Sequence, residues 1–238
     1  MAIRFWAAGS AVNGVATTLA LIAPTLNVND IIIAQIVSQD NDAAATPDAT
    51  WTSINELNNG VGLRSSLYWK RAVTGSSGAT FTFTGLAGTT SNLGILTVYR
   101  GCKVDNSPIG SITSSANVSA DAVTYATLTP TANTSAIIAA GFYADNATTA
   151  GSITSTAPSS FANVVDEEAV PAGAGLSLFQ YWGVNNVGGA TGALSHTTTS
   201  TVDGVNNGIL FELLAEEGFG GLGQTGIVYP RRVRQGNR

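Results

Sequence analysis

The chain has 238 residues, of which 11% are charged, and a formal net charge of −5. Soluble domains usually carry about 25% charged residues, so Thr, Ser, Asn and Gly must cover much of this surface. The single Cys102 excludes a disulfide scaffold and a cysteine zinc site, and we expect it to be a small buried hydrophobe. Because the branched Cβ of Thr suits a pleated, half-buried surface, the composition favours an all-β protein.

Short runs rich in Val, Ile, Thr and aromatic residues recur between clusters of Gly, Asn, Ser and Pro, which is typical of β-strands. The number of predicted strands is too large for an immunoglobulin-type module and fits an antiparallel, jelly-roll-like β-sandwich. We predict strands near residues 3–8, 17–23, 30–38, 50–57, 64–73, 79–85, 93–100, 109–114, 122–129, 135–143, 160–166, 176–183, 193–200 and 207–215.

Residues 1–217 are predicted to form the sandwich, either as one unit or as two sub-domains that divide near residue 105. No internal repeat is exact. The segments DIIIAQIVSQD (30–40) and SAIIAAGFYAD (135–145) nevertheless share an apolar run that ends at an Asp. This weak similarity is the only hint of repetition in the sequence.

Residues 218–238 are predicted to form an extended arm, because a glycine-dense stretch breaks regular structure there. The arm carries one short apolar patch around Tyr229. Four of the ten cations of the chain lie at its end, whereas every Asp and Glu precedes it. These cations are Arg231, Arg232, Arg234 and Arg238.

The acidic body disfavours nucleic acid as a partner, because phosphate contacts need cations. We expect the arm arginines to pair with carboxylates of a neighbouring subunit rather than with phosphate, since the planar guanidinium matches a carboxylate well. No apolar run approaches the roughly 20 residues of a membrane span, and no signal peptide is visible. We therefore expect a soluble protein made in the cytosol, whose weakly charged surface is partly covered in an assembly.

No arrangement of side chains indicates an enzyme. His196 is the only histidine, and the adjacent Ser195 would point to the opposite face of a strand, which disfavours a Ser-His-Asp triad. No glycine-rich loop precedes a helix, so no nucleotide cofactor is expected.

Two acidic segments are candidate sites. Residues 40–42 (Asp-Asn-Asp) offer alternate oxygen ligands for Ca²⁺, or a turn in which Asp and Asn bond their own backbone. Asp166, Glu167 and Glu168 are predicted as an acidic loop or a short helical turn. They could supply the paired carboxylates of a glycoside hydrolase, but a loop lacks the apolar pocket that raises one pKa.

The aromatic and basic run at 67–71 is predicted to be part of a strand. By period-2 alternation, Leu67 and Trp69 share a core face, while Tyr68 and Lys70 share the outer face. We therefore predict Tyr68 and Lys70 as contacts for a partner, together with Tyr229 and the four arginines of the arm.

An ordered set of segments in residues 1–105 resembles β-sandwich domains of virion structural proteins from tailed bacteriophages and prophages. The segments are NDIIIAQI (29–36), ATWTSI (49–54), LYWKRA (67–72), ATFTFT (79–84) and GILTVYRG (94–101). The chain departs from the usual pattern in having Asn-Asp for Gly-Asp at 29–30 and Ala-Thr-Trp for the Gly-Trp corner at 49–51.

The resemblance implies a non-enzymatic role in a virion that is assembled in the host cytoplasm. Such a protein decorates or cements the capsid, forms a head fibre, or belongs to the tail. The partners would be further copies of the chain, with a trimer among the possible states, and the major capsid protein or another virion protein. The alternative is a carbohydrate- or receptor-binding module of a fibre, with Tyr68, Tyr143, Tyr181 or Trp182 stacking on sugar rings.

Overall fold

The computed structural model describes residues 2–39, 45–60, 62–145, 152–153, 158, 160–169, 175–185, 189–199 and 204–216. All regular elements in these ranges are β-strands, and every strand pair is antiparallel. The prediction of an all-β, antiparallel fold is therefore confirmed.

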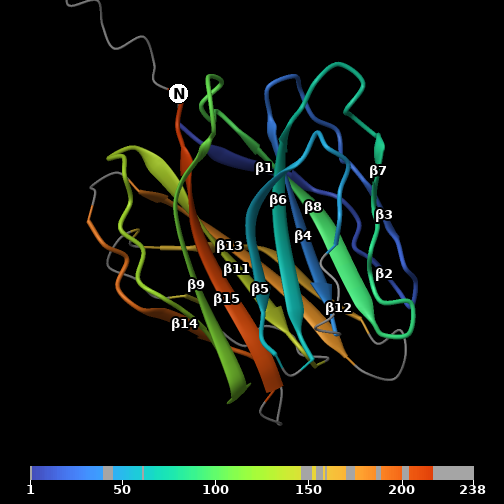
Figure 1. The fold of residues 1–238 in the computed structure, drawn as a ribbon. Coiled ribbons are helices and arrows are strands. Elements are labelled where there is room, and N and C mark those ends of the chain that lie inside the picture. The colour runs from blue at the N-terminus through green and yellow to red at the C-terminus, as the bar shows by residue number, and fades with distance from the viewer. Residues whose placement is uncertain are drawn as a thin grey trace, which may run out of the picture.

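The first half of the chain forms one large sheet and one small sheet (Figure 1). The large sheet has the order β1-β8-β4-β6-β5, and β2 also pairs with β8; the small sheet is the pair β3-β7. The strands are β1 (Arg4–Ala8), β2 (Val12–Gly14), β3 (Leu19–Ile22), β4 (Ile31–Ser38), β5 (Thr52–Asn58), β6 (Arg64–Arg71), β7 (Thr80–Phe83) and β8 (Asn92–Arg100).

The second half forms a large sheet of order β12-β13-β11-β15-β9 and the small pair β10-β14. Its strands are β9 (Ile109–Ala120), β10 (Ala122–Tyr125), β11 (Ser135–Tyr143), β12 (Ala162–Ala169), β13 (Leu176–Asn185), β14 (Leu194–Thr197) and β15 (Gly204–Leu214). Compared with the sequence prediction, β2 was missed, β9 runs further, and β10 ends earlier.

Apart from β2, the two halves have the same strand order. Taken in chain order, β9 corresponds to β1, and β10 to β15 correspond to β3 to β8. Each strand has the same position in its sheet as its counterpart. The register also shifts in equivalent strand pairs of the two halves. These pairs are β1-β8 and β5-β6 in the first half, and β9-β15 and β12-β13 in the second half. Bulges are designed features of a family rather than accidents, so the two halves are structural repeats of one unit.

Equivalent positions follow from the register. The similar segments DIIIAQIVSQD and SAIIAAGFYAD contain β4 and β11, the central strands of the two large sheets. Tyr68 and Trp69 on β6 correspond to Tyr181 and Trp182 on β13. The runs Asn-Leu-Gly-Ile-Leu (92–96) and Asn-Asn-Gly-Ile-Leu (206–210) correspond on β8 and β15.

Three apolar cores hold the molecule together. A shared core lies between the two large sheets and contains side chains of both, among them Ile33, Tyr99, Ile138 and Phe211. A first-half core fills the space between its large sheet and β3-β7, and a second-half core does the same beneath β10-β14. The boundary between the halves lies between β8 and β9, beside residue 105, and the shared core joins the halves across it. Cys102 belongs to this core and is buried, as predicted.

Three polar side chains are buried in the shared core and bond across it. The Gln35 amide donates to the carbonyl oxygens of Gly141 (3.1 Å) and Phe179 (3.0 Å) on the opposite sheet. The Tyr99 hydroxyl donates to Gln180 Oε1 (2.7 Å), and the Gln180 amide donates to Gln35 Oε1 (3.2 Å). Because an unpaired buried polar group is costly, these bonds hold the two sheets in one alignment.

The departure at residue 29 from the bacteriophage pattern has a simple backbone explanation. Asn29 has a φ of 71°, in the left-handed region. Gly adopts this conformation most readily, and Asn is among the few other residues that visit it routinely. The turn before β4 therefore tolerates Asn in the place of Gly.

Candidate functional site

The predicted contact residues on β6 do not share an exposed face. Leu67 is buried in the shared core and Trp69 packs against it, as predicted. Tyr68, however, is only 3% exposed and belongs to the first-half core, beside Phe83. The prediction that Tyr68 faces outward is wrong, because the small sheet β3-β7 covers the face that the sequence pattern left open. Tyr68 thus offers no surface to a partner.

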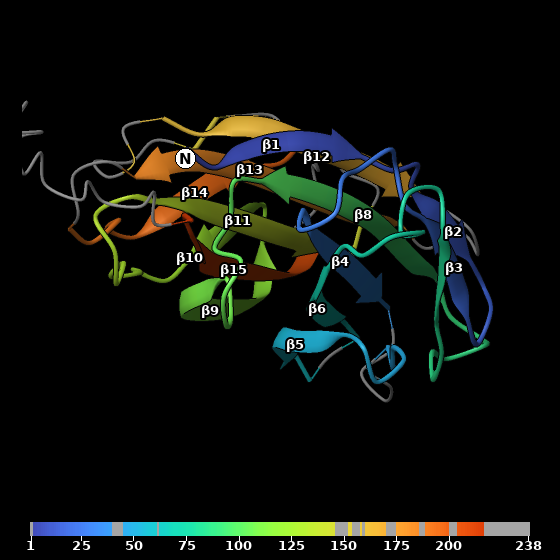
Figure 2. The same cartoon turned by 90° about the horizontal axis from the view of Figure 1, so that it is seen from above.

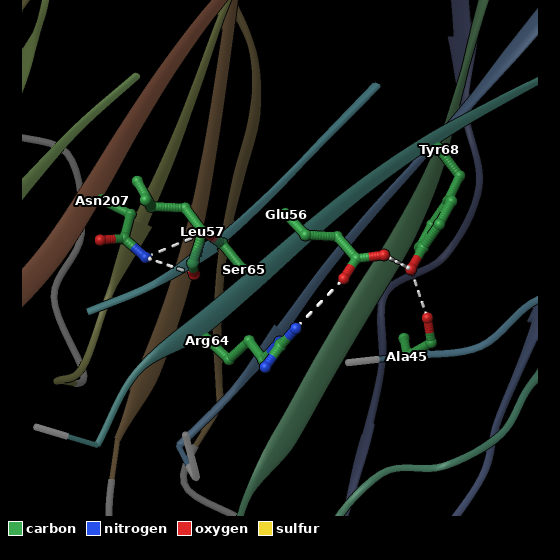
Figure 3. Close-up of polar contacts among 7 residues, drawn as sticks. All are labelled: Ala45, Glu56, Leu57, Arg64, Ser65, Tyr68 and Asn207. Atoms are coloured by element: carbon green, nitrogen blue, oxygen red, sulfur yellow. Dashed lines mark hydrogen bonds and ion pairs between the residues drawn. The ribbon is translucent and has the colours of Figure 1, made fainter. Parts of the chain in front are cut away.

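The Tyr68 hydroxyl lies where the first-half core meets the polar end of β5 (Figure 3). It approaches two acceptors, Glu56 Oε1 at 2.6 Å and the carbonyl oxygen of Ala45. Burial raises the pKa of the hydroxyl, and the neighbouring Glu56 carboxylate raises it further. Glu56 also forms an ion pair with Arg64 (3.2 Å), so this group anchors β5 to β6.

The variant Tyr68→Phe should lower the free energy of unfolding by about 1 kcal/mol, because Glu56 Oε1 loses the hydroxyl that donates to it. Urea denaturation measures this change. Glu56→Gln, which keeps an acceptor oxygen at the same place, should cost less. An unchanged midpoint for Tyr68→Phe would mean that the hydroxyl faces water instead.

Lys70 is half-buried and is engaged within its own half. Its ammonium group lies 4.9 Å from the centre of the Phe81 ring and 5.8 Å from that of Trp51, and it contacts the Thr50 hydroxyl. Asp48 accepts a hydrogen bond from the Thr50 amide (2.8 Å). The cation therefore caps an aromatic cluster at the surface. Tyr229 and the four arginines of the predicted arm lie outside the described residues.

The aromatic residues proposed to stack on sugars are mostly buried. Tyr143 and Tyr181 are fully enclosed, and Trp182 packs against the shared core. The Tyr143 hydroxyl donates to the carbonyl oxygen of Ala120 (2.8 Å) and accepts from the Gly204 amide (2.9 Å). The prediction that these tyrosines are exposed is wrong, because each lies on the covered face of its sheet.

Trp6 is an exposed aromatic residue that the sequence reasoning did not select. It is 43% exposed on β1, and the Arg100 guanidinium stacks on its ring at 3.6 Å from the ring centre. Arg4 lies over the same ring at 5.2 Å. The indole N–H donates to the carbonyl oxygen of Thr25 (3.1 Å). The signal was present in the predicted strand 3–8, where Arg4 and Trp6 alternate with the apolar Ile3 and Phe5.

The stacked Arg100 is held in place by Asp30. Its Nε and one terminal nitrogen donate to the two carboxylate oxygens at 2.9 and 2.7 Å. The hydrogen bond to Asp30 raises the pKa of Arg100. Because this bidentate geometry fixes the guanidinium plane, the Trp6 ring is held against a rigid support. Arg4 is the exposed cation of the group.

A shallow apolar hollow of about 280 Å³ is lined by Pro24, the residue before the Thr25 carbonyl that Trp6 binds. Its rim includes Ile22, whose side chain is 55% exposed. The hollow is lined by Ala8, Gly9, Ser10, Val12, Ile22, Ala23 and Pro24. Together, Trp6 and the hollow make an apolar surface with a cationic margin.

The acidic run does not form a loop or helical turn. Asp166, Glu167 and Glu168 lie on β12, the edge strand of the second-half sheet, so that prediction is wrong. Asp166 and Glu168 are exposed, whereas Glu167 is half-buried. Burial raises the pKa of Glu167, and the adjacent Asp166 adds to the rise. An edge strand accommodates three successive acids because a strand neighbours it on one side only.

His196 lies in the second-half core and is 2% exposed. Its Nδ1 is 3.1 Å from the Tyr125 hydroxyl, and its ring centre is 4.9 Å from that of Phe179 and 5.0 Å from that of Tyr181. Burial lowers its pKa to about 4. At neutral pH this histidine is an uncharged packing residue.

Within the described ranges no three His, Cys, Asp or Glu side chains come together as metal ligands. The proposed Ca²⁺ ligands at 40–42 lie outside those ranges. The described part of the chain also has no helix that could cross a membrane.

Comparisons with protein-family models, with curated proteins and with solved structures gave no match to this chain.

Proposed function

We propose that the chain is a non-enzymatic structural protein of a tailed-bacteriophage or prophage virion. In this role it decorates or cements the capsid as an oligomer, and its partners are further copies of itself and the major capsid protein or another virion protein. The observation that carries the proposal is the placement of the five bacteriophage-like segments. They coincide with five consecutive strands, β4 to β8. Four of these strands belong to the first large sheet, and β7 belongs to the small sheet β3-β7.

The doubled fold supports an architectural role. The shared core and its buried polar network tie the halves into one body, which suits a protein that must reinforce a particle. The glycan-binding alternative needs exposed aromatic rings, whereas Tyr68, Tyr143 and Tyr181 are buried and Trp182 is partly buried. The architectural proposal is therefore favoured over a sugar-binding one.

We interpret each half as a small jelly roll. The nested antiparallel pairings support this interpretation: β1 with β8, β3 with β7 and β4 with β6, and likewise β9 with β15, β10 with β14 and β11 with β13. In a jelly roll such nested pairs are folded over into two facing sheets. The extra strand β5, or β12 in the second half, extends the large sheet at one edge.

The proposal is tested with particles of the bacteriophage that encodes the chain. The chain should be present in purified particles, and the purified protein should co-sediment with particles that lack it. Its absence from the particles, together with a failure to co-sediment, would overturn the proposed function.

Residues 218–238 are proposed to act as an arm that reaches a neighbouring subunit. Removing residues 219–238 should weaken co-sedimentation by about tenfold or more, since several charge-assisted contacts are lost at once. The thermal unfolding midpoint of the sandwich should be unchanged. If the truncated chain joined particles as well as the full chain, the arm assignment would be wrong.

A further inference from the structure

We propose that two copies of the chain associate along one open side of the sandwich, with β1 of each copy beside β12 of the other. This interface deepens the oligomeric part of the proposed function and rests on it. The proposal is carried by the position of the two strands, by their charges and by a comparison of the two halves.

Strands β1 and β12 are the edge strands of the two large sheets, and they lie against each other (Figure 2). Among the described residues, β1 pairs only with β8, and β12 pairs only with β13. Within the described ranges, neither outer edge therefore has a strand partner. Such an edge is a template for pairing with another chain unless it is covered or blunted.

The side chains of the two strands alternate between the shared core and the outer faces. On β1, Phe5 packs against the shared core, whereas Arg4 and Trp6 are exposed on the outer face of the first sheet. On β12, Val165 and Ala169 lie in the shared core, whereas the exposed acids lie on the outer face of the second sheet. The two outer faces thus carry opposite charge at the same open side.

This charge pattern selects one arrangement of the copies. When the first sheet of one copy continues into the second sheet of the other, their outer faces join, and Arg4 and Trp6 approach Glu168 and Asp166. The alternative, β1 against β1, would place Arg4 beside Arg4 and acids beside acids, which is unfavourable for directly opposed strands. The selected arrangement is isologous, because both copies use the same two strands. β1 of each copy lies beside β12 of the other copy.

Comparison of the halves shows that the repeated strand order does not depend on a Trp6 group. At the equivalent interruption of the register, the second half has Gly110 in the place of Trp6 and Leu214 in the place of Arg100. The second half forms the same strand order without an aromatic or a cation there. Trp and Arg are enriched in the cores of protein interfaces, so their presence in one half alone fits a contact surface.

The test is sedimentation equilibrium of the purified full-length chain at low ionic strength, with circular dichroism as a check of folding. The wild type should dimerise reversibly, and added salt should weaken the dimer because exposed charges are screened. Arg4→Glu and Glu168→Arg should each weaken dimerisation by about tenfold or more, since each contact occurs twice and attraction becomes repulsion. The double variant Arg4→Glu/Glu168→Arg should recover an affinity within about threefold of the wild type.

Trp6→Ala should also weaken the dimer, by about tenfold. Matched controls are Ile112→Ala and Asp121→Arg, which change an exposed apolar residue and an exposed acid of the second half away from β12. Both should leave the dimer unchanged.

Three outcomes would overturn the interface: a wild-type chain that stays monomeric, single charge reversals without effect, or a double variant that fails to recover. None of these bears on whether the chain is present in particles, which tests the proposed function separately.

Discussion

Replacing His196 by Phe should remove most of the loss of stability of this protein between about pH 6.5 and pH 4. His196 is enclosed by Tyr125, Phe179 and Tyr181, and burial lowers its pKa to about 4 from an ordinary value of 6.5. In the unfolded chain the imidazole takes up a proton near pH 6.5, whereas in the folded protein it stays neutral until about pH 4.

The stabilising effect of the buried neutral ring is therefore complete above pH 6.5 and is lost as the pH falls towards 4. A shift of this size corresponds to about 3 kcal/mol of unfolding free energy. Phe cannot take up a proton, so the variant lacks this contribution to acid sensitivity. Urea denaturation at a series of pH values between 4 and 7.5 measures how steeply the free energy of unfolding depends on pH.

The first half supplies the matched control. Phe83 on β7 lies 6.0 Å from Tyr68, as His196 on β14 lies 5.0 Å from the equivalent Tyr181. Phe83→His should introduce the same kind of acid sensitivity into the first half. An identical pH slope for the wild type and His196→Phe would show that the folded protein protonates His196 as readily as the unfolded chain does.

Gly208→Ala should destabilise the protein by about 3 kcal/mol or more, whereas Gly94→Ala should cost about 1 kcal/mol. The two glycines are equivalent, since Gly94 pairs with Ile36 on β4 and Gly208 pairs with Gly141 on β11. A Cβ on Gly208 would collide with the main-chain carbonyl of Thr124 on the covering strand β10.

A Cβ on Gly94 would meet only the ends of side chains, at 3.2 Å from Leu19 and 3.3 Å from Leu21 and Ile36. Side-chain ends can move by a few tenths of an ångström, but the carbonyl belongs to a paired strand. Denaturant unfolding of both variants measures the difference. Equal effects would mean that β10 lies no closer to its sheet than β3 does.

Much of the strand content could be read from the sequence, because most strands are short apolar runs between turn residues. The predicted bounds of the strand at 135–143 match β11, whose residues are all buried. The β2 strand was missed because three residues carry too little pattern. The acids at 166–168 are predicted as a loop or helical turn because exposed charge runs are usually solvated, and nothing local shows that a strand lies at the edge of a sheet.

The candidate site was harder to predict, because period-2 alternation tells which side chains share a face but not which face is covered. Alternation predicts Tyr68 on the outer face because Leu67 and Trp69 face a core, whereas each large sheet packs on both faces. The repeat was visible only as a weak likeness between two central strands. The matching pairs Tyr68-Trp69 and Tyr181-Trp182 become equivalent once the register is known.

The single thiol has a practical consequence for following the motions of this molecule. Cys102 lies in the shared core, and its backbone forms an isolated bridge with Ala215, where the end of the first half meets the last strand. Burial raises the pKa of the thiol to about 12, so it is protonated and shielded at neutral pH. A thiol reagent can react with it only when the seam between the halves opens. The labelling rate under native conditions therefore reports how often the two repeats separate, without any probe added to the chain.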